Sequence, residues 1–235
     1  MKIKQQKQIK KFLFEEFGKE KGTVVFEKQN EVLKELITNT KNKSKNQMKT
    51  LTNTILPRIA LYKVLQKEDL PKDEVTNYMR KYMIEKIAQK KHSSTAKMEI
   101  VPGFYSFYSK VFLKIMRTTD LQKSEQKCGK GFFDVTIKKC LWHTACIEND
   151  CPELCRLFCD VDNVTYGGLK KIGFTRTQTL GYDGECCDFH FYKKWFINLK
   201  LFVKPKSFFG LCWILWGFMG STKIKRRWFL WGHTK

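Results

Sequence analysis

The sequence lacks most of the short motifs that identify a known chemistry. It has no glycine-rich phosphate loop of the Walker type, no Ser-His-Asp set with a nucleophile elbow, and no Cys-x-x-Cys zinc knuckle. It has no internal repeat, and its apolar run at residues 208–220 is shorter than the about 20 residues of a membrane-spanning helix. Nucleotide-driven chemistry and a repeat architecture are therefore not expected.

Acidic residues are also scarce. The chain has 23 Asp and Glu residues against 45 Lys and Arg residues, which gives a formal net charge of +22. The lysines are spread along the chain instead of being gathered in arginine-rich blocks with interleaved aromatic residues, so no specific nucleic-acid partner is expected. The same charge would attract small anionic substrates.

An export signal is missing as well. The first residues, Met1–Lys7, contain no apolar core of the kind that secretion requires. Together with nine cysteines, this indicates a reducing compartment, so we expect a cytoplasmic protein with free thiols instead of structural disulfides.

Helical periodicity dominates the first half of the 235 residues. It predicts helices from the N-terminus to about Glu20, from Thr23 to the polar residues 40–49, over Leu51–Gln66, from Leu70 to about Gln89, and over Phe104–Met116. Pro57 must mark a helix start or a kink. His92–Thr95 is expected to interrupt the helices. The stripe of the last helix is expected in the core, with a pocket wall as the alternative, and consists of Phe107, Val111, Phe112 and Ile115.

Strands are predicted only in the second half. Residues 122–130 read as a charged linker, after which Phe133, Val135 and Ile137 alternate with polar residues as in a half-buried strand. A hairpin is predicted from Phe174–Leu180 and Glu185–Lys193, with its turn at Gly181–Gly184. The expected fold class is therefore α+β, with N-terminal helices packed on a small antiparallel sheet.

A cysteine-rich helix is predicted between these strands. Pro152 suits its first turn, and Gly167-Gly168 should end it. The spacing of four, four and three places three sulfurs and one carboxylate on one face, from Cys151, Cys155, Cys159 and Asp162. We expect the functional site between this helix and the sheet.

Several segments resemble the L-2-amino-thiazoline-4-carboxylic acid hydrolase family. They are the run Cys151–Asp162, the segments Arg176–Gly181 and Gly184–Phe191, and the earlier Ile55–Tyr62 with its Leu-Pro pair. The resemblance implies a domain of residues 51–193, preceded by a helical extension of residues 1–50 and followed by a tail of residues 194–235. It also implies hydrolytic opening of a small cyclic amidine or thiazoline, giving N-carbamoyl-L-cysteine, without a redox cofactor.

That reaction requires groups that move protons and hold a carboxylate. Asp162 is the expected base, with Asp160 as the second choice, and His143 and His190 compete for the role of acid. Arg176 is the expected clamp for the carboxylate of a small anionic substrate, with Thr179 next to it in the substrate site.

Cys159 has three interpretations. It could attack the ring carbon, although the neighbouring Asp162 should raise the pKa of its thiol, so a histidine such as His143 would be needed to activate it. It could be one of several inert buried thiols. It could also belong to a zinc site, whose ligands would be Cys140, Cys155, Cys159 and Cys187.

Two readings from other functional classes stay open. The cysteine-rich helix and the following strands also resemble, more distantly, the small-molecule-binding domains related to bacteriochlorophyll vinyl reductase, which implies a non-catalytic ligand sensor. The tail after Lys193 combines the apolar residues 208–220 with Lys223, Arg226 and Arg227. It could contact a membrane surface, pack on the domain, or be a tail that a shifted gene boundary has added to the domain, and no functional claim is based on it.

Overall fold

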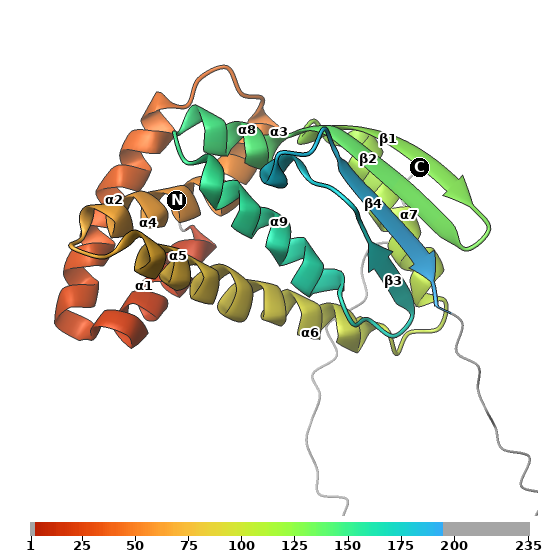
Figure 1. Ribbon diagram of the computed structural model, residues 1–235, viewed down its shortest axis with the longest axis horizontal. Coiled ribbons are helices and arrows are strands. Elements are labelled where there is room, and N and C mark those ends of the chain that lie inside the picture. The colour runs from red at the N-terminus through yellow and green to blue at the C-terminus, as the bar shows by residue number, and fades with distance from the viewer. Residues whose placement is uncertain (1–2, 195–235) are drawn as a thin grey trace, which may run out of the picture. The chain divides into compact units, whose positions relative to one another are not determined.

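Helices occupy the first half of the chain and a four-stranded sheet follows (Figure 1). The computed structural model describes residues 3–194. The α-helices are α1 (Lys4–Phe17), α2 (Lys19–Asn39), α3 (Lys45–Thr50), α4 (Leu56–Lys67), α5 (Lys72–Arg80), α6 (Gln89–Met98), α7 (Phe104–Thr118), α8 (Leu141–Glu148) and α9 (Pro152–Tyr166). Two π-helical segments, η1 (Leu51–Ile55) and η2 (Lys81–Ala88), lead into α4 and α6, and a short 3₁₀ turn is η3 (Leu180–Tyr182). The strands are β1 (Gln122–Gly129), β2 (Phe132–Cys140), β3 (Ile172–Thr175) and β4 (Cys187–Lys193), which confirms the α+β class.

The sheet is antiparallel throughout, with the strand order β1-β2-β4-β3. One face is buried, as the alternation on β2 predicts, because Phe133, Val135 and Ile137 are at most 6% exposed. On β4, Cys187 and Phe191 face the same way and are also buried. The opposite face is more exposed to solvent. An enclosed cavity can therefore form only on the buried face of the sheet.

The segment predicted as a charged linker is the edge strand β1. Its residues 122–129 pair with β2 along their whole length, so the prediction of a linker is wrong. The residues themselves carry little strand signal, since Lys123, Glu125 and Lys127 alternate with small or polar side chains. Pairing with the strongly patterned β2 supplies the strand instead, and the exposed charges discourage further pairing at this edge.

The predicted hairpin is present, but its first strand ends earlier than expected. β3 stops at Thr175, and residues 176–186 form a loop. The Asp188 carboxylate accepts hydrogen bonds from the backbone amides of Thr177 at 3.0 Å and Gln178 at 2.8 Å, which holds this segment away from the ladder. Asp183 then turns the chain with a φ of 61°.

The polar residues His92–Thr95 do not interrupt the helices. They lie within α6, which continues from α5 through η2. The Ser94 and Thr95 hydroxyls donate to the carbonyls of Lys90 and Lys91, four residues earlier, at 2.9 and 3.0 Å. These side chains are satisfied within the helix, so they do not end it.

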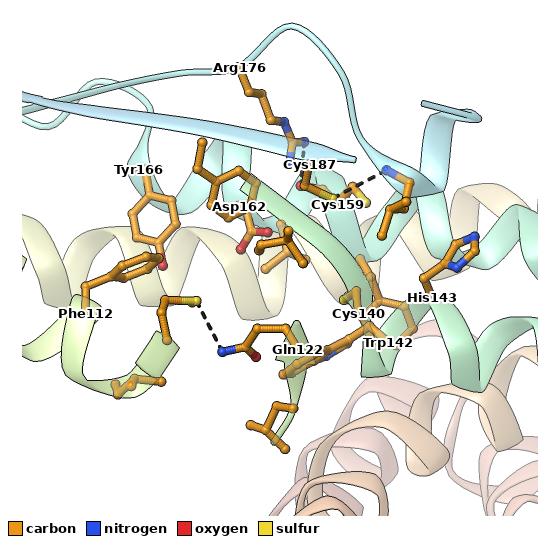
Figure 2. A pocket seen from close by; sticks show the side chains of 18 of the residues that line it. Phe112, Gln122, Cys140, Trp142, His143, Cys159, Asp162, Tyr166, Arg176 and Cys187 are labelled. Atoms are coloured by element: carbon orange, nitrogen blue, oxygen red, sulfur yellow. Dashed lines mark hydrogen bonds between the residues drawn. The ribbon is translucent and has the colours of Figure 1, made fainter. Parts of the chain in front are cut away.

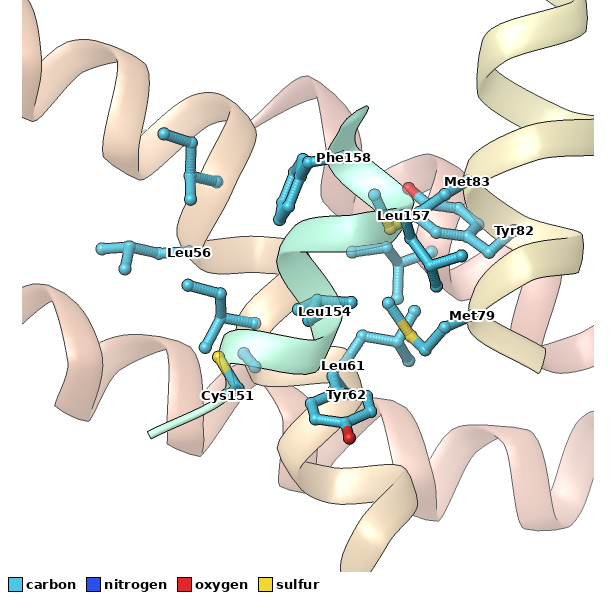
Figure 3. Packing of buried hydrophobic residues seen from close by; sticks show 14 of the residues in the cluster. Leu56, Leu61, Tyr62, Met79, Tyr82, Met83, Cys151, Leu154, Leu157 and Phe158 are labelled. Carbon is cyan, nitrogen blue, oxygen red and sulfur yellow. The ribbon is translucent and has the colours of Figure 1, made fainter. Parts of the chain in front are cut away.

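Helix α9 lies between the helical layer and the sheet (Figure 1). Pro152 is at its first position and Gly167 ends it, as predicted. The side that faces the other helices buries Leu154, Leu157 and Phe158 against α4, α5 and η2, as Figure 3 shows. The same core includes Ile9 and Phe12 of α1, so the N-terminal helices contribute to it.

A second core lies on the buried face of the sheet. Phe112 of α7 packs against Phe133 and Phe191, with ring centroids 5.7 and 4.9 Å apart, and Tyr166 of α9 packs edge-on to Phe191. The prediction that the whole α7 stripe is core is wrong, because Phe107, Val111 and Ile115 are 55%, 42% and 45% exposed.

None of the helices within residues 3–194 is long and apolar enough to cross a membrane. The tail after Lys194, with its apolar run and basic cluster, lies outside the described residues.

Candidate active site

A cavity of about 390 Å³ lies between α9 and the sheet (Figure 2). Its walls come from α4, α6, α7, α8, α9, three strands and the loop after β3. The charged, imidazole and thiol groups that line it are Arg58, Lys91, Asp162, Arg176, His143, Cys140, Cys155, Cys159 and Cys187. A concave site with a few polar groups in an otherwise apolar wall is the usual form of a ligand pocket.

Helix α9 supplies one wall through residues that share a face. Cys155, Cys159, Asp162 and Tyr166 follow each other at spacings of four, three and four, which brings all of them to the side that faces the sheet. Cys151, expected on this face, is instead the buried N-cap of the helix and does not line the cavity.

Asp162 is the only acid among the described residues that line the cavity. Burial raises the pKa of its carboxyl from 3.8 to about 7, although the positive charges of Arg176 and Lys91 favour the ionised form. A carboxyl with such a pKa can both accept and donate a proton near neutral pH.

Arg176 reaches the cavity from the loop after β3. Its Nη2 donates to the main-chain oxygen of Cys159 at 2.8 Å, and the guanidinium lies over the ring of Phe189 at 5.7 Å from the centroid. Its Nη1 is buried and has no hydrogen-bond partner among the described residues. A buried guanidinium nitrogen without an acceptor is costly, so this atom is placed to receive an anionic group.

Two further cations line the same cavity. Arg58 of α4 is 3% exposed and lies over the Phe158 ring at 5.4 Å; burial lowers its pKa to about 10, so it stays charged at neutral pH. With the Gln5 amide oriented so that its oxygen faces Arg58, that oxygen accepts from Nε at 3.2 Å and Nη2 at 2.8 Å. Lys91 is exposed at the edge of the cavity. Three cations against one carboxyl of raised pKa make this a site for anions.

Cys159 differs from the thiols around it. Hydrogen bonds from the Cys155 and Cys187 thiols, the nearby Thr179 side chain and the charge of Arg176 lower the pKa of Cys159. In contrast, burial raises the pKa of Cys140 to about 11. The neighbouring thiols and Arg176 favour the thiolate of Cys159. Activation of Cys159 by a histidine such as His143 stays a prediction.

The structure separates the two candidate histidines. His143 lines the cavity, whereas His190 lies on the opposite face of the sheet. There its Nδ1 is 2.5 Å from the carboxylate of Asp134, its partner across β2 and β4. His190 therefore cannot reach a ligand in the cavity.

Two other predicted residues also lie outside the cavity wall. Thr179 is buried next to Cys159 and does not line the cavity. The Asp160 carboxylate accepts from the Tyr182 hydroxyl at 2.9 Å and lies 3.6 Å from the Arg80 guanidinium. Of the two aspartates, Asp162 is the one placed for chemistry in the cavity.

The four cysteines considered as zinc ligands all line the cavity. Within residues 3–194, however, no group of three or more His, Cys, Asp or Glu side chains is arranged to hold a metal ion. A zinc centre has no support from this geometry.

Two residues of the cavity wall, Arg58 and Lys91, were not predicted from the sequence as site residues. Arg58 had a usable signal, since it is a lone cation in the apolar segment Leu56–Leu61 and a buried charge in such a position needs a reason. Lys91 had none, because it is one of many lysines and only the fold brings it to the cavity.

Comparison with known proteins confirms the family resemblance of the sequence segments. A family model described as L-2-amino-thiazoline-4-carboxylic acid hydrolase matches residues 47–191, which include every residue of the cavity wall. No curated protein matches the chain significantly. Among solved structures, the chain is similar to the Fe(II) unliganded H-NOX protein from K. algicida at 11% identity and a TM-score of 0.30, over 84% of this chain and 98% of that chain. So low a TM-score supports no conclusion about fold or function.

Proposed function

Because the chain belongs to the L-2-amino-thiazoline-4-carboxylic acid hydrolase family, we propose that it hydrolyses the ring of a small cyclic amidine carboxylate. L-2-Amino-thiazoline-4-carboxylate, which would give N-carbamoyl-L-cysteine, is the reference substrate. The observation that carries the proposal is the meeting of Asp162, Cys159 and the unpaired Nη1 of Arg176 in one cavity. These groups supply a proton carrier, a thiolate and an anion clamp.

In the proposed reaction, water adds to the ring carbon that lies between nitrogen and sulfur. Asp162 removes a proton from the attacking water, and the carbon becomes tetrahedral. The proton of the added hydroxyl passes to the ring nitrogen, the carbonyl forms as the carbon–sulfur bond breaks, and the departing thiolate takes the proton back from Asp162. Substrate plus one water equals product, with no change in oxidation state. The pKa of about 7 suits a group that must act first as base and then as acid.

Arg176 has the role of binding the substrate carboxylate. Its Nη2 is engaged by the Cys159 carbonyl, and its free Nη1 is available to a second acceptor. The bond to Cys159 also holds the guanidinium in place before the substrate arrives, which lowers the entropic cost of binding. His143, also in the wall, is available to protonate the amidine nitrogen.

Cys159 offers a covalent route to the same product. Its thiolate would attack the same ring carbon and displace the ring sulfur, and water would then release the carbamoyl product and regenerate the thiol. Its lowered pKa and its place in the cavity wall support this role. The two routes differ in one observable, a mass adduct on Cys159 in a rapidly quenched reaction.

Steady-state turnover of L-2-amino-thiazoline-4-carboxylate by variants tests the assignments. We expect Asp162→Asn to lower kcat by about 10²–10⁴-fold through loss of acid–base catalysis. Arg176→Gln should raise KM by roughly ten- to a hundredfold, since a hydrogen bond between charged groups contributes about 1.5–3 kcal/mol. Asp183→Asn is the matched control, because the side chain of Asp183 is 87% exposed and outside the cavity.

Circular dichroism spectra equal to that of the wild type are required for each variant. An unchanged kcat in Asp162→Asn would remove this residue from the mechanism, and an unchanged KM in Arg176→Gln would remove the clamp.

A non-catalytic ligand-binding module is the second candidate. It is favoured by the many apolar side chains of the cavity wall, among them Phe112, Trp142, Phe158 and Phe189. Saturable binding of the thiazoline carboxylate without product would support this candidate over the hydrolase.

A further inference from the structure

The cavity has two chemically different ends (Figure 2). Arg176, Cys159 and Asp162 form the polar end, on the side of the sheet and α9. Gln122 and Trp142 lie on the opposite side, and helix α7 closes the wall between them and Tyr166. A ring with one carboxylate needs only the polar end, so the rest of the cavity requires its own explanation.

Helix α7 faces the cavity with an apolar stripe. Its lining residues are spaced by three, one, three and one, as on one face of a helix: Tyr108, Val111, Phe112, Ile115 and Met116. Only Phe112 of these is buried; Val111 and Ile115 remain 42% and 45% exposed. An apolar helix stripe that lines a cavity without being covered gains free energy when an apolar ligand covers it.

The Gln122 amide nitrogen at this end already has hydrogen-bond partners. Gln122 Nε2 donates to the Met116 sulfur and to the Thr119 hydroxyl, both at 3.2 Å. Leu121 and Trp142 complete the wall around it. Apart from the indole N–H of Trp142, this end therefore offers apolar surface, whereas the polar end has the unpaired Nη1 of Arg176 together with the charge of Lys91 near Asp162.

We propose that the site takes amphipathic carboxylates, in which an anionic head binds Arg176 and an apolar body lies along α7. The inference rests on the proposed function for the role of Arg176 as the carboxylate clamp, and it extends the substrate class from the unsubstituted ring to cyclic amidine carboxylates that carry an apolar substituent. The volume of about 390 Å³ is within the roughly 300–1,000 Å³ of pockets that hold such ligands.

Calorimetric titration of the full chain with butanoate, hexanoate, octanoate and decanoate tests the inference. Burial of each added methylene should tighten binding about fourfold until the α7 end is filled, with one ligand bound per chain. Arg176→Gln should weaken the binding of every member by a similar factor, because it acts on the shared head.

Charged substitutions on α7 test the apolar end. Val111→Asp and Ile115→Asp should flatten the dependence on chain length, and both sites are exposed enough for the variants to fold. The matched control is Val24→Asp on α2, where the valine is 52% exposed and outside the cavity. Equal affinities across the series, or the same flattening in Val24→Asp, would overturn the inference.

The result is separable from that of the hydrolase proposal. A chain-length gradient without turnover of the thiazoline would support the amphipathic site and contradict the hydrolase. Turnover of the thiazoline without a dependence of affinity on chain length would support the hydrolase and contradict the amphipathic site.

Discussion

Asp162 and Cys159 lie one helical turn apart on α9 and influence each other's charge. Burial raises the pKa of Asp162, and the neighbouring Cys159 adds to this rise. Donation from the Cys155 and Cys187 thiols lowers the pKa of Cys159. Asp162, beside Arg176, is therefore able to exchange a proton near neutral pH.

The raised pKa of Asp162 predicts a pH-dependent stability. In the unfolded chain the carboxyl titrates near 3.8 and in the folded chain near 7, so the folded state binds the extra proton between these values. The contribution of Asp162 to stability is therefore complete below pH 3.8 and is lost as the pH rises through about 7. Asp162→Asn, which cannot ionise, should gain stability over the wild type across this range.

Urea denaturation measures the difference in free energy of unfolding between Asp162→Asn and the wild type. It is carried out at pH 5 and at pH 8, because most of the contribution of Asp162 is lost between these values. Asp183→Asn serves as the control for loss of a surface carboxylate. A stability difference between Asp162→Asn and the wild type that is the same at both pH values would contradict the assigned burial.

At the scale of elements, α9 connects the two cores. Its helix-facing side chains fix it against α4, α5 and η2, and its other face presents the catalytic candidates to the sheet. The position of Asp162 therefore depends on packing at Leu154 and Leu157, which are buried against the other helices and do not line the cavity.

Leu154→Ala should destabilise the fold by about 2–5 kcal/mol, because Leu154 is 1% exposed and its truncation leaves a cavity. Arg156→Ala on the same helix is the control; its side chain is 53% exposed, pairs with Asp183 and lies over the Tyr182 ring at the surface, so a loss of at most about 1 kcal/mol is expected. Chemical denaturation gives both values. Equal losses would show that α9 is not anchored through Leu154.

Elements with a strong local sequence pattern could be predicted from the sequence. Elements whose conformation depends on contacts with a neighbouring segment could not. The alternation on β2, Pro152 at the start of α9 and the glycines at its end carry strong local signals. In contrast, β1 is a strand because β2 is beside it, and the loop of residues 176–186 follows from the capping of Thr177 and Gln178 by Asp188. The sequence predicted Asp162, His143 and Arg176 in one site but included His190, which the pleat of β4 turns to the other face.

At the scale of the whole molecule, the helices before the family match contribute to the site. Ile9, Phe12 and Leu13 of α1 belong to the core that holds α4, and Gln5 provides the acceptor for the buried Arg58. The net charge of +22 has its counterpart in the cavity, where Arg58, Lys91 and Arg176 outnumber the one acid. This excess of cations over acids in the cavity favours a small anionic substrate.

The most direct test of this account is mass spectrometry of the product formed when the purified full chain meets L-2-amino-thiazoline-4-carboxylate in heavy-oxygen water. We predict a product with the mass of the substrate plus one water, carrying one heavy oxygen atom, which is absent from a boiled control and forms about 10²–10⁴-fold more slowly with Asp162→Asn. Unchanged substrate after incubation with the folded protein would contradict the hydrolase assignment.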